Sequence, residues 1–470
     1  MMFLKTIKYS LISWLVGLPL FPQATSLSLA EAVSRTLAQN RDVLSAKLAV
    51  QVKENETLAA KTRRWPSLTT SGQVGPLLNR PTLTFTQGTL GSFPSTGPIP
   101  ATNRDISIPR KISGYGISQA SVPLTQQWRL GLNVKAARED EEVARAQASE
   151  VRGAAVGRVR SLYFQIAALD SAQKVAKAQL EAAEEVSRLA RDGVAQGTAL
   201  RADETRADAR LAQAKADSAN IAADLQDGIE QLNLLMGDTL DAQFVVTTDQ
   251  REEFSLTQEE ARQRAVENRP ELKEGKIRLD QANLSVRSKR LEQIPDLNFV
   301  VSDLYFLNTS NYLPNQIASA GLSLSWEPWD WGRKQHEAAA LKAKEEQQRL
   351  AVAQMEQQVK FEADRAWREY ERSNRTWQAS QLATRSAEEQ LRVVKERYTR
   401  QAALLRDLLE AQTNWEAAGQ TEARDLAAVG TAWANLQTAI GNDERSNDSE
   451  ANSNFRNPGG SNAAEHVLRR

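Results

Sequence analysis

Residues 319–339 read SAGLSLSWEPWDWGRKQHEAA and change character twice. From Ala318 to Trp326, apolar residues alternate with small polar ones, so a β-strand here has one apolar and one polar face. Three tryptophans follow around a proline: Trp326, Trp329 and Trp331. The sequence then becomes charged and alanine-rich, which is typical of a long solvated helix. This order predicts a strand in lipid, an aromatic group at the lipid surface and a helix in water.

Composition excludes several classes of protein. The 470 residues include 59 basic and 59 acidic side chains, so the zero net charge favours no nucleic-acid partner. The chain has no cysteine, which excludes disulfides, thiolate metal sites and a lipid anchor on an N-terminal cysteine. Its two histidines, His336 and His466, lie in polar surroundings. No catalytic, cofactor or metal motif is visible, so we do not expect an enzyme.

The N-terminus resembles a secretory signal peptide. Lys5 and Lys8 precede an apolar stretch at residues 11–21, and small and polar residues follow at 22–26. We expect residues 1–26 to be removed on export across a bacterial inner membrane. After residue 25 there is no apolar run of the ~20 residues that a membrane helix needs.

The remaining chain is an internal duplication. Pro66 matches Pro295 at an offset of 229, and Pro123 matches Pro328 at an offset of 205, because the first copy has 24 more residues between its two prolines. We predict a first repeat at 27–237, a linking segment at 238–254, a second repeat at 255–441 and a polar, disordered tail at 442–470. Each repeat reads as helix, strand, loop, strand and a long helical stretch with one interruption.

Local signals mark the ends of these elements. Ser28 followed by Glu31 is a capping-box pattern, and it predicts a helix that runs to the proline at 66. The loop from Pro76 to Arg110 is rich in Pro, Gly, Thr and Ser, so we expect an exposed excursion with little regular structure. The long helical stretches are interrupted near Gly193 and Gln401.

The first long helix carries a coiled-coil repeat. Small or apolar residues recur every seven positions at Ala155, Leu162, Leu169, Ala176, Ala183 and Ala190, with a second series four residues behind. Unbroken from Leu124 to Arg191, this helix is roughly 100 Å long at ~1.5 Å per residue. Taken alone, this stretch favours an ordinary coiled-coil rod.

The strands favour a tube over a rod. Each repeat offers two strands of about ten residues, long enough to cross a bilayer at a tilt. Strands in lipid must form a closed barrel, and four are too few for one. Two chains supply eight strands, which enclose only side chains, whereas three supply twelve and open a lumen. A transport role therefore favours a homotrimer.

The tryptophans support insertion in a membrane. Trp326, Trp329 and Trp331 lie where strand meets helix, and Trp128 lies at the matching place in the first repeat. Indole rings settle at the lipid–water boundary. We interpret these four residues as a membrane-interface belt; the alternative is a cluster of core tryptophans in a soluble domain.

The duplicated order resembles the TolC family of outer-membrane efflux ducts. The likeness runs from Leu27 to Gly441. It rests on the similar repeat starts, the Asn-Arg turns at Asn40 and Asn268, Pro-x-Leu before the strands and Pro-Trp-Asp-Trp-Gly-Arg after them. The resemblance implies a mainly α-helical fold in which antiparallel coiled-coil helices form an α-barrel. It also implies a trimeric, twelve-stranded transmembrane β-barrel with four strands per chain.

The resemblance also implies functional residues. At the periplasmic mouth it points to a gate or constriction, formed by Asp203, Tyr398, Asp407 and Glu410. Hairpin tips that contact a periplasmic adaptor would include Gly193, Val194, Gly197, Thr198, Arg400 and Gln401. Two positions depart from the family pattern, because Gln401 replaces a usual glycine and Ala403 an arginine found in some relatives. With these two departures, the sequence does not decide whether the closed state is locked by charge.

Two functions follow as hypotheses. The first is a passive exit duct in the outer membrane that extends into the periplasm and serves a tripartite efflux or type I secretion system. Its partners would be an adaptor, an inner-membrane pump and outer-membrane lipid. The second is a secreted or periplasmic coiled-coil structural protein without a channel. The sequence leaves the transported substrate open among drugs, metals, small metabolites and polypeptides.

Overall fold

The computed structural model describes residues 25–76, 78, 82–107, 112–197, 199–247, 256–308, 314–400 and 402–442. The predicted signal peptide and C-terminal tail therefore lie almost wholly outside the described residues, as do Thr198 and Gln401. In chain order the long elements are α1 (Leu29–Gln39), α2 (Arg41–Thr62), β2 (Ser67–Pro76), β7 (Ile112–Pro123), α3 (Gln127–Ala195), α4 (Arg201–Met236), α5 (Gln258–Asn268), α6 (Pro270–Leu291), β9 (Asp296–Leu307), β10 (Gln316–Ser325), α7 (Arg333–Thr399) and α8 (Leu405–Ala439).

The chain forms two compact units, and each takes segments from both repeats. The first unit comprises Met1–Ala46, Ser149–Pro270 and Glu356–Arg470, and the second comprises Lys47–Ala148 and Glu271–Met355. No helix of the described residues has the length and apolarity needed to cross a membrane.

The first unit has its core around a small parallel sheet. Strand β1 (Thr25–Leu27) pairs with β8 (Phe244–Val246), and Leu27 lies opposite Val246. On α3, the Tyr163 hydroxyl donates to the Leu27 carbonyl at 2.9 Å and accepts from the Thr247 N–H at 3.1 Å. One side chain therefore fixes both strands to α3. The buried residues around it include Val33, Val156, Val159, Ile166, Leu232 and Met236.

Helix starts follow the predicted capping chemistry only in part. The Ser28 hydroxyl accepts from the Glu31 N–H at 3.2 Å, but the Glu31 carboxylate binds Arg35 at 2.6 Å. In the second repeat the box is complete: Thr257 Oγ1 accepts from the Glu260 N–H at 3.3 Å, and Glu260 Oε2 accepts from the Thr257 N–H at 2.8 Å. The prediction is therefore half right at Ser28, because Arg35 competes for the carboxylate.

The helix predicted to run to Pro66 is two helices, so that prediction is wrong in detail. Asn40 ends α1, and its Oδ1 accepts from the Val43 N–H at 3.2 Å, which begins α2. Its Nδ2 also donates to the Leu235 carbonyl at 2.9 Å. The second repeat breaks in the same place, where Pro270 opens α6 after Arg269.

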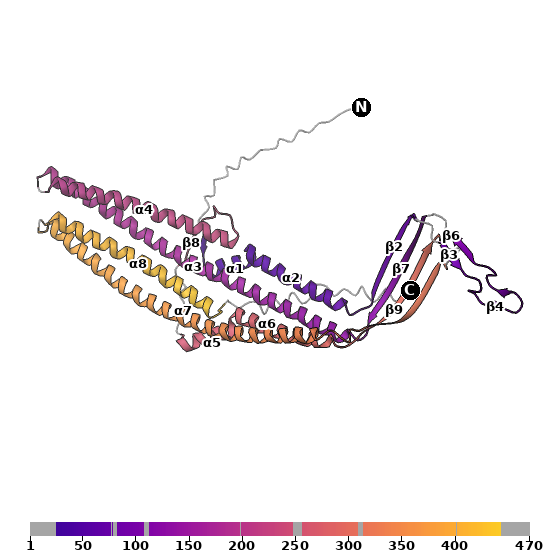
Figure 1. Ribbon diagram of the computed structural model, residues 1–470. Helices are drawn as coiled ribbons and strands as arrows, with labels where there is room; N and C mark the ends of the chain where they lie inside the picture. The colour runs from indigo at the N-terminus through magenta and orange to yellow at the C-terminus, as the bar shows by residue number, and fades with distance from the viewer. Residues whose placement is uncertain are drawn as a thin grey trace, which may run out of the picture. The chain divides into compact units, whose positions relative to one another are not determined.

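The predicted coiled-coil seam is buried at most of its positions, and Leu162, Leu169, Gln173 and Leu180 are half-buried. Within the first unit, Val159, Ala183 and Ala190 are at most 2% exposed. Polar Ser187 also lies on the seam, where its hydroxyl donates to Asp208 on α4 at 2.7 Å. Figure 1 shows α3 beside α4, and α7 beside α8, as two helical hairpins.

The second unit contains the four-stranded antiparallel sheet, in the order β10–β9–β7–β2. Its strands have 10 to 12 residues, as predicted. Ala320 lies opposite Val301 and Leu322 opposite Phe299, so apolar side chains of neighbouring strands share one face. Within the described residues, β2 and β10 each have one edge without a partner strand.

The excursion between β2 and β7 is regular, contrary to prediction. Strands β3 (Thr82–Phe85) and β6 (Arg104–Ser107) pair antiparallel, and farther out β4 (Ser92–Phe93) pairs with β5 (Gly97–Pro98). Figure 1 shows this ribbon beyond the far end of β2 and β7. We call residues 82–107 the arm. Turn-forming residues concealed the pairing, because it joins segments about twenty positions apart.

Candidate functional site

The two helical hairpins end in short turns at the predicted tips. Gly193 is buried near the end of α3, and its carbonyl accepts from the Ala199 N–H at 3.2 Å. Gly197 has a φ of +75°, a conformation that favours glycine, and its N–H donates to the Val194 carbonyl at 3.0 Å. In the second turn Arg400 follows α7 and is exposed.

An apolar cluster joins the two hairpins next to these turns. Val186, Ala190 and Ala207 from the first hairpin pack with Leu405, Leu408 and Leu409 from the second. The ring of Tyr398 packs against the same cluster. The hairpins therefore meet through apolar contacts beside their ends.

The predicted gate residues divide into two local pairs. Tyr398 lies near Asp203: burial raises the pKa of the Tyr398 hydroxyl, and the negative charge of Asp203 raises it further. Asp203 also lies 4.0 Å from Arg206 on its own helix. Asp407 caps α8, because its Oδ2 accepts from the Leu404 N–H at 3.2 Å. Glu410 is exposed about one turn farther along α8.

The predicted belt residues are exposed where strands meet helices in the second unit. Trp128 in the first turn of α3 is 67% exposed, and the three tryptophans between β10 and α7 are 57–87% exposed. The rings of Trp329 and Trp331 meet edge to face, with centroids 5.7 Å apart. These exposures show that the four residues do not form a buried core among the described residues of this chain.

A fifth tryptophan belongs with this group and was missed. Trp65 directly precedes the proline before β2 and is 72% exposed. The sequence contained the signal, because Trp65 adjoins Pro66 at a helix–strand junction, much as Trp326 lies two residues before Pro328.

The Trp-Asp-Trp-Gly sequence makes a fixed turn before α7. The Asp330 carboxylate accepts from the N–H groups of Gly332 at 3.1 Å and Lys334 at 3.0 Å. These hydrogen bonds, that of Lys334 above all, lower the pKa of Asp330. Trp331 has a φ of +56°, unusual for a bulky residue, and Asp330 holds the turn on both sides of it.

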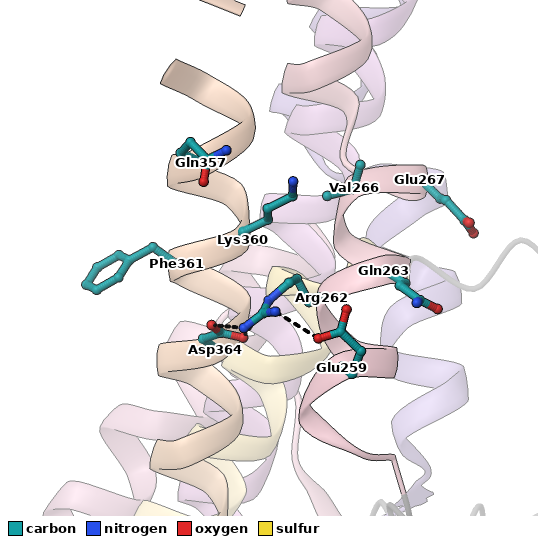
Figure 2. A pocket seen from close by; sticks show the side chains of 9 residues that line it. All are labelled: Glu259, Arg262, Gln263, Val266, Glu267, Gln357, Lys360, Phe361 and Asp364. Carbon is teal, nitrogen blue, oxygen red and sulfur yellow. Dashed lines mark hydrogen bonds and ion pairs between the residues drawn. The ribbon is translucent and has the colours of Figure 1, made fainter. Parts of the chain in front are cut away.

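A groove of the first unit lies between α5 and α7 and has a volume of about 670 Å³. Figure 2 shows Arg262 between Glu259 and Asp364. Arg262 binds Glu259 at 2.8 Å, and its Nε and Nη2 bind the two oxygens of Asp364 at 3.3 and 2.7 Å. Across the described residues there is no group of three or more His, Cys, Asp or Glu side chains placed to hold a metal ion.

Comparison with known proteins identifies the family. The family model described as "Outer membrane efflux protein" matches residues 32–238 and 261–442, which is most of the chain and falls on both repeats. The chain belongs to this family. The predicted resemblance is thereby confirmed.

Similar proteins include one curated relative and several solved structures. The cobalt-zinc-cadmium resistance protein CzcC of Cupriavidus metallidurans is 26% identical over 189 residues, which are 40% of this chain and 45% of the relative. The CmeC outer membrane channel of Campylobacter jejuni has a TM-score of 0.73 at 15% identity, over 97% of both chains. VceC of Vibrio cholerae has a TM-score of 0.69 at 16% identity, over 88% of this chain and 96% of that one. These structures share the fold, so the predicted fold class is confirmed.

In this efflux-family chain, a polar contact between the hairpins was also missed. Arg210 on α4 lies 3.7 Å from Glu416 on α8 and donates to the Thr413 hydroxyl. Burial raises the pKa of Glu416, whereas the charge of Arg210 lowers it. Gln412 donates to the Glu416 carboxylate at 3.0 Å. No local pattern announces this contact, because its partners lie more than 200 residues apart.

Proposed function

We propose that the protein is the outer-membrane exit duct of a tripartite efflux or type I secretion system. Three copies join their sheets edge to edge into one barrel, and their helical hairpins continue as a tunnel into the periplasm. Substrates delivered by an inner-membrane pump through a periplasmic adaptor pass through it without a reaction or a cofactor.

One observation carries this proposal: each chain has a four-stranded antiparallel sheet with two unpaired edges and an exposed apolar face. Edges and apolar faces of this kind are unstable in water and are satisfied in a closed barrel in lipid. The five exposed tryptophans at the strand–helix junctions are placed to form the belt at the lipid boundary.

In this proposal the hairpin turns are the periplasmic mouth. Three copies of Asp203, Asp407 and Glu410 bring carboxylates around one axis, where they attract cations and repel anions. Tyr398 lies near Asp203 and packs on the apolar contact between the hairpins. The turns themselves contact the adaptor, through the predicted residues Gly193, Val194, Gly197, Thr198, Arg400 and Gln401. The repeats at 27–237 and 255–441 are the two halves of each subunit.

Planar-bilayer recordings test the duct and its gate together. Purified protein should give discrete cation-selective channels, and Asp407→Asn with Glu410→Gln should reduce cation selectivity and raise conductance. Asn keeps the size of the Asp407 side chain. Asp407→Asn alone measures separately any effect of weakening the hydrogen bond from the Leu404 N–H to this side chain. Protein that gives no channels contradicts the duct, and unchanged selectivity removes these carboxylates from the gate.

The transported substrate is best sought among metal cations first, because the similar protein CzcC is named for cobalt, zinc and cadmium resistance. Deletion of the gene should lower tolerance to these metals if they are the cargo. A panel that includes drugs and detergents distinguishes other cargo, and equal tolerance of all compounds contradicts an efflux role under the growth conditions used.

A further inference from the structure

The arm has a defined structure of its own. Beyond the β3–β6 ladder, the Leu90 N–H donates to the Ile99 carbonyl at 2.9 Å, and the Ile99 N–H donates to the Gly91 carbonyl at 2.8 Å. Nearer its base, Thr84 Oγ1 donates to Asp105 at 2.6 Å. These contacts hold the two sides of the arm together along its length.

The surface of the arm is unusually apolar for an exposed ribbon. Its 26 residues include only two charged side chains, Arg104 and Asp105. Leu90 is 62% exposed and Phe93 is 50% exposed, and Leu83 and Ile106, which lie opposite each other, are each 38% exposed. A two-stranded ribbon alone in water is marginally stable, and a group of exposed apolar side chains indicates a contact surface.

The position of the arm indicates what it contacts. It connects the end of β2, the strand at one edge of the sheet, to the start of β7, the next strand in the sheet. When copies join edge to edge, the next strand beyond β2 is β10 of the neighbouring copy, about 4.8 Å away. The first residue of β10, Gln316, lies at the same end of the sheet as the end of β2. There the neighbouring copy presents Asn315 and Gln316 at the start of its β10.

We propose that the arm crosses the seam between copies and packs its apolar side chains on the neighbouring subunit, at the start of its β10. This inference rests on the proposed trimeric duct and assigns a partner to a segment that only the first repeat possesses. The arm thereby clamps each seam at the end of the barrel opposite the helices. Its 24 extra residues serve assembly.

Cysteine cross-linking tests the clamp directly, because the natural chain has no cysteine. The arm pair is Leu90→Cys with Asn315→Cys, treated with a short bismaleimide in intact outer membranes. We expect covalent dimers and trimers under denaturing conditions. A link within one chain gives no larger species, so only contacts between copies are counted. Each single-cysteine variant measures the background of cross-links between the same position in two copies.

A seam pair separates failure of the arm from failure of the trimer. Ser71→Cys with Ile317→Cys places cysteines on β2 and β10 at the same level and on the same face of the sheet. If the seam pair links and the arm pair gives no more product than Leu90→Cys alone, the clamp is wrong and the duct stands. If the seam pair also fails, the proposed trimeric barrel itself is contradicted.

Removal of the apolar contact gives a second readout. Leu90→Ser with Phe93→Ser should shorten the half-time of trimer dissociation in warm detergent by roughly 5- to 30-fold. The matched control Thr89→Ser with Thr96→Ser alters the same part of the arm without removing a large apolar group. Equal half-times for the two double variants overturn the proposal.

Discussion

Substitution of Arg210 should loosen the contact between the two helical hairpins. Arg210 on α4 binds Glu416 at 3.7 Å and the Thr413 hydroxyl on α8. The Glu416 side chain is only 15% exposed, so Arg210→Ala leaves a mostly buried carboxylate without its cation. Loss of one partner of a fully buried pair costs roughly 3–5 kcal/mol. Because Arg210 is 35% exposed and screened by solvent, we expect about 1–2 kcal/mol.

That free energy should appear as channel opening. If the hairpins separate when the periplasmic mouth opens, a loss of about 1–2 kcal/mol raises the ratio of open to closed channels roughly 5- to 30-fold. Single-channel recordings in planar bilayers at neutral pH measure this ratio. Arg188→Ala is the matched control, because Arg188 is 60% exposed and binds only Glu185 and Asp192 on its own helix among the ion pairs of the described residues.

Acidification should partly reverse the effect. Burial raises the pKa of Glu416 in the folded protein, so folding favours its protonated form and the packed hairpins gain stability as pH falls through that pKa. Arg210 lowers this pKa, and its removal therefore moves the gain to higher pH. Arg210→Ala channels should close on mild acidification more than the natural protein does. An open fraction equal to that of Arg188→Ala at every pH would refute the reasoning.

Three further substitutions test packing and ion pairs, each by the unfolding of purified protein. Gly430→Ala places a Cβ against the Cβ of Phe164, so it should destabilise the first unit by about 1–3 kcal/mol; an unchanged melting temperature contradicts this packing. Gly237→Ala should cost roughly 1–2 kcal/mol, because the residue has a φ of +80° and its Cβ would lie 3.0 Å from the Gln39 carbonyl; a neutral result argues against the left-handed cap. The hydrogen bond from Arg262 lowers the pKa of Asp364, so this pair stabilises the fold above the carboxyl's unfolded pKa, and the stabilisation is lost as pH falls through the lower folded pKa. Arg262→Gln should therefore reduce the loss of unfolding free energy on acidification, measured by urea titration at a series of pH values. An identical loss in the variant and the natural protein excludes this pair as its cause.

Patterns that are periodic along the chain predicted most of the fold. The alternation in β10 and the seven-residue series in α3 are local, so a short window of sequence specifies which side chains share a face. The duplication strengthened these predictions, because matching segments of the two repeats predict the same secondary structure. The break at Asn40 was harder to predict, because it depends on the Leu235 carbonyl far along the chain.

Contacts between distant segments were not predictable in this way. Arg210 and Glu416 are ordinary charged residues on solvated-looking helices, and only the packing of α4 on α8 brings them together. The strand pairs of the arm were not predicted, because glycine and proline mark turns without indicating which strands the turns connect. Asp407 combines both situations: the resemblance suggested a gate residue, and the structure also gives it the local task of capping α8.

The proposed duct requires three chains to close one barrel. Native mass spectrometry of the purified protein in detergent counts the chains directly. We predict a single species of three chains, which supplies twelve strands and leaves a lumen. A stable species of one or two chains contradicts the account, because four strands cannot close in lipid and eight leave no channel.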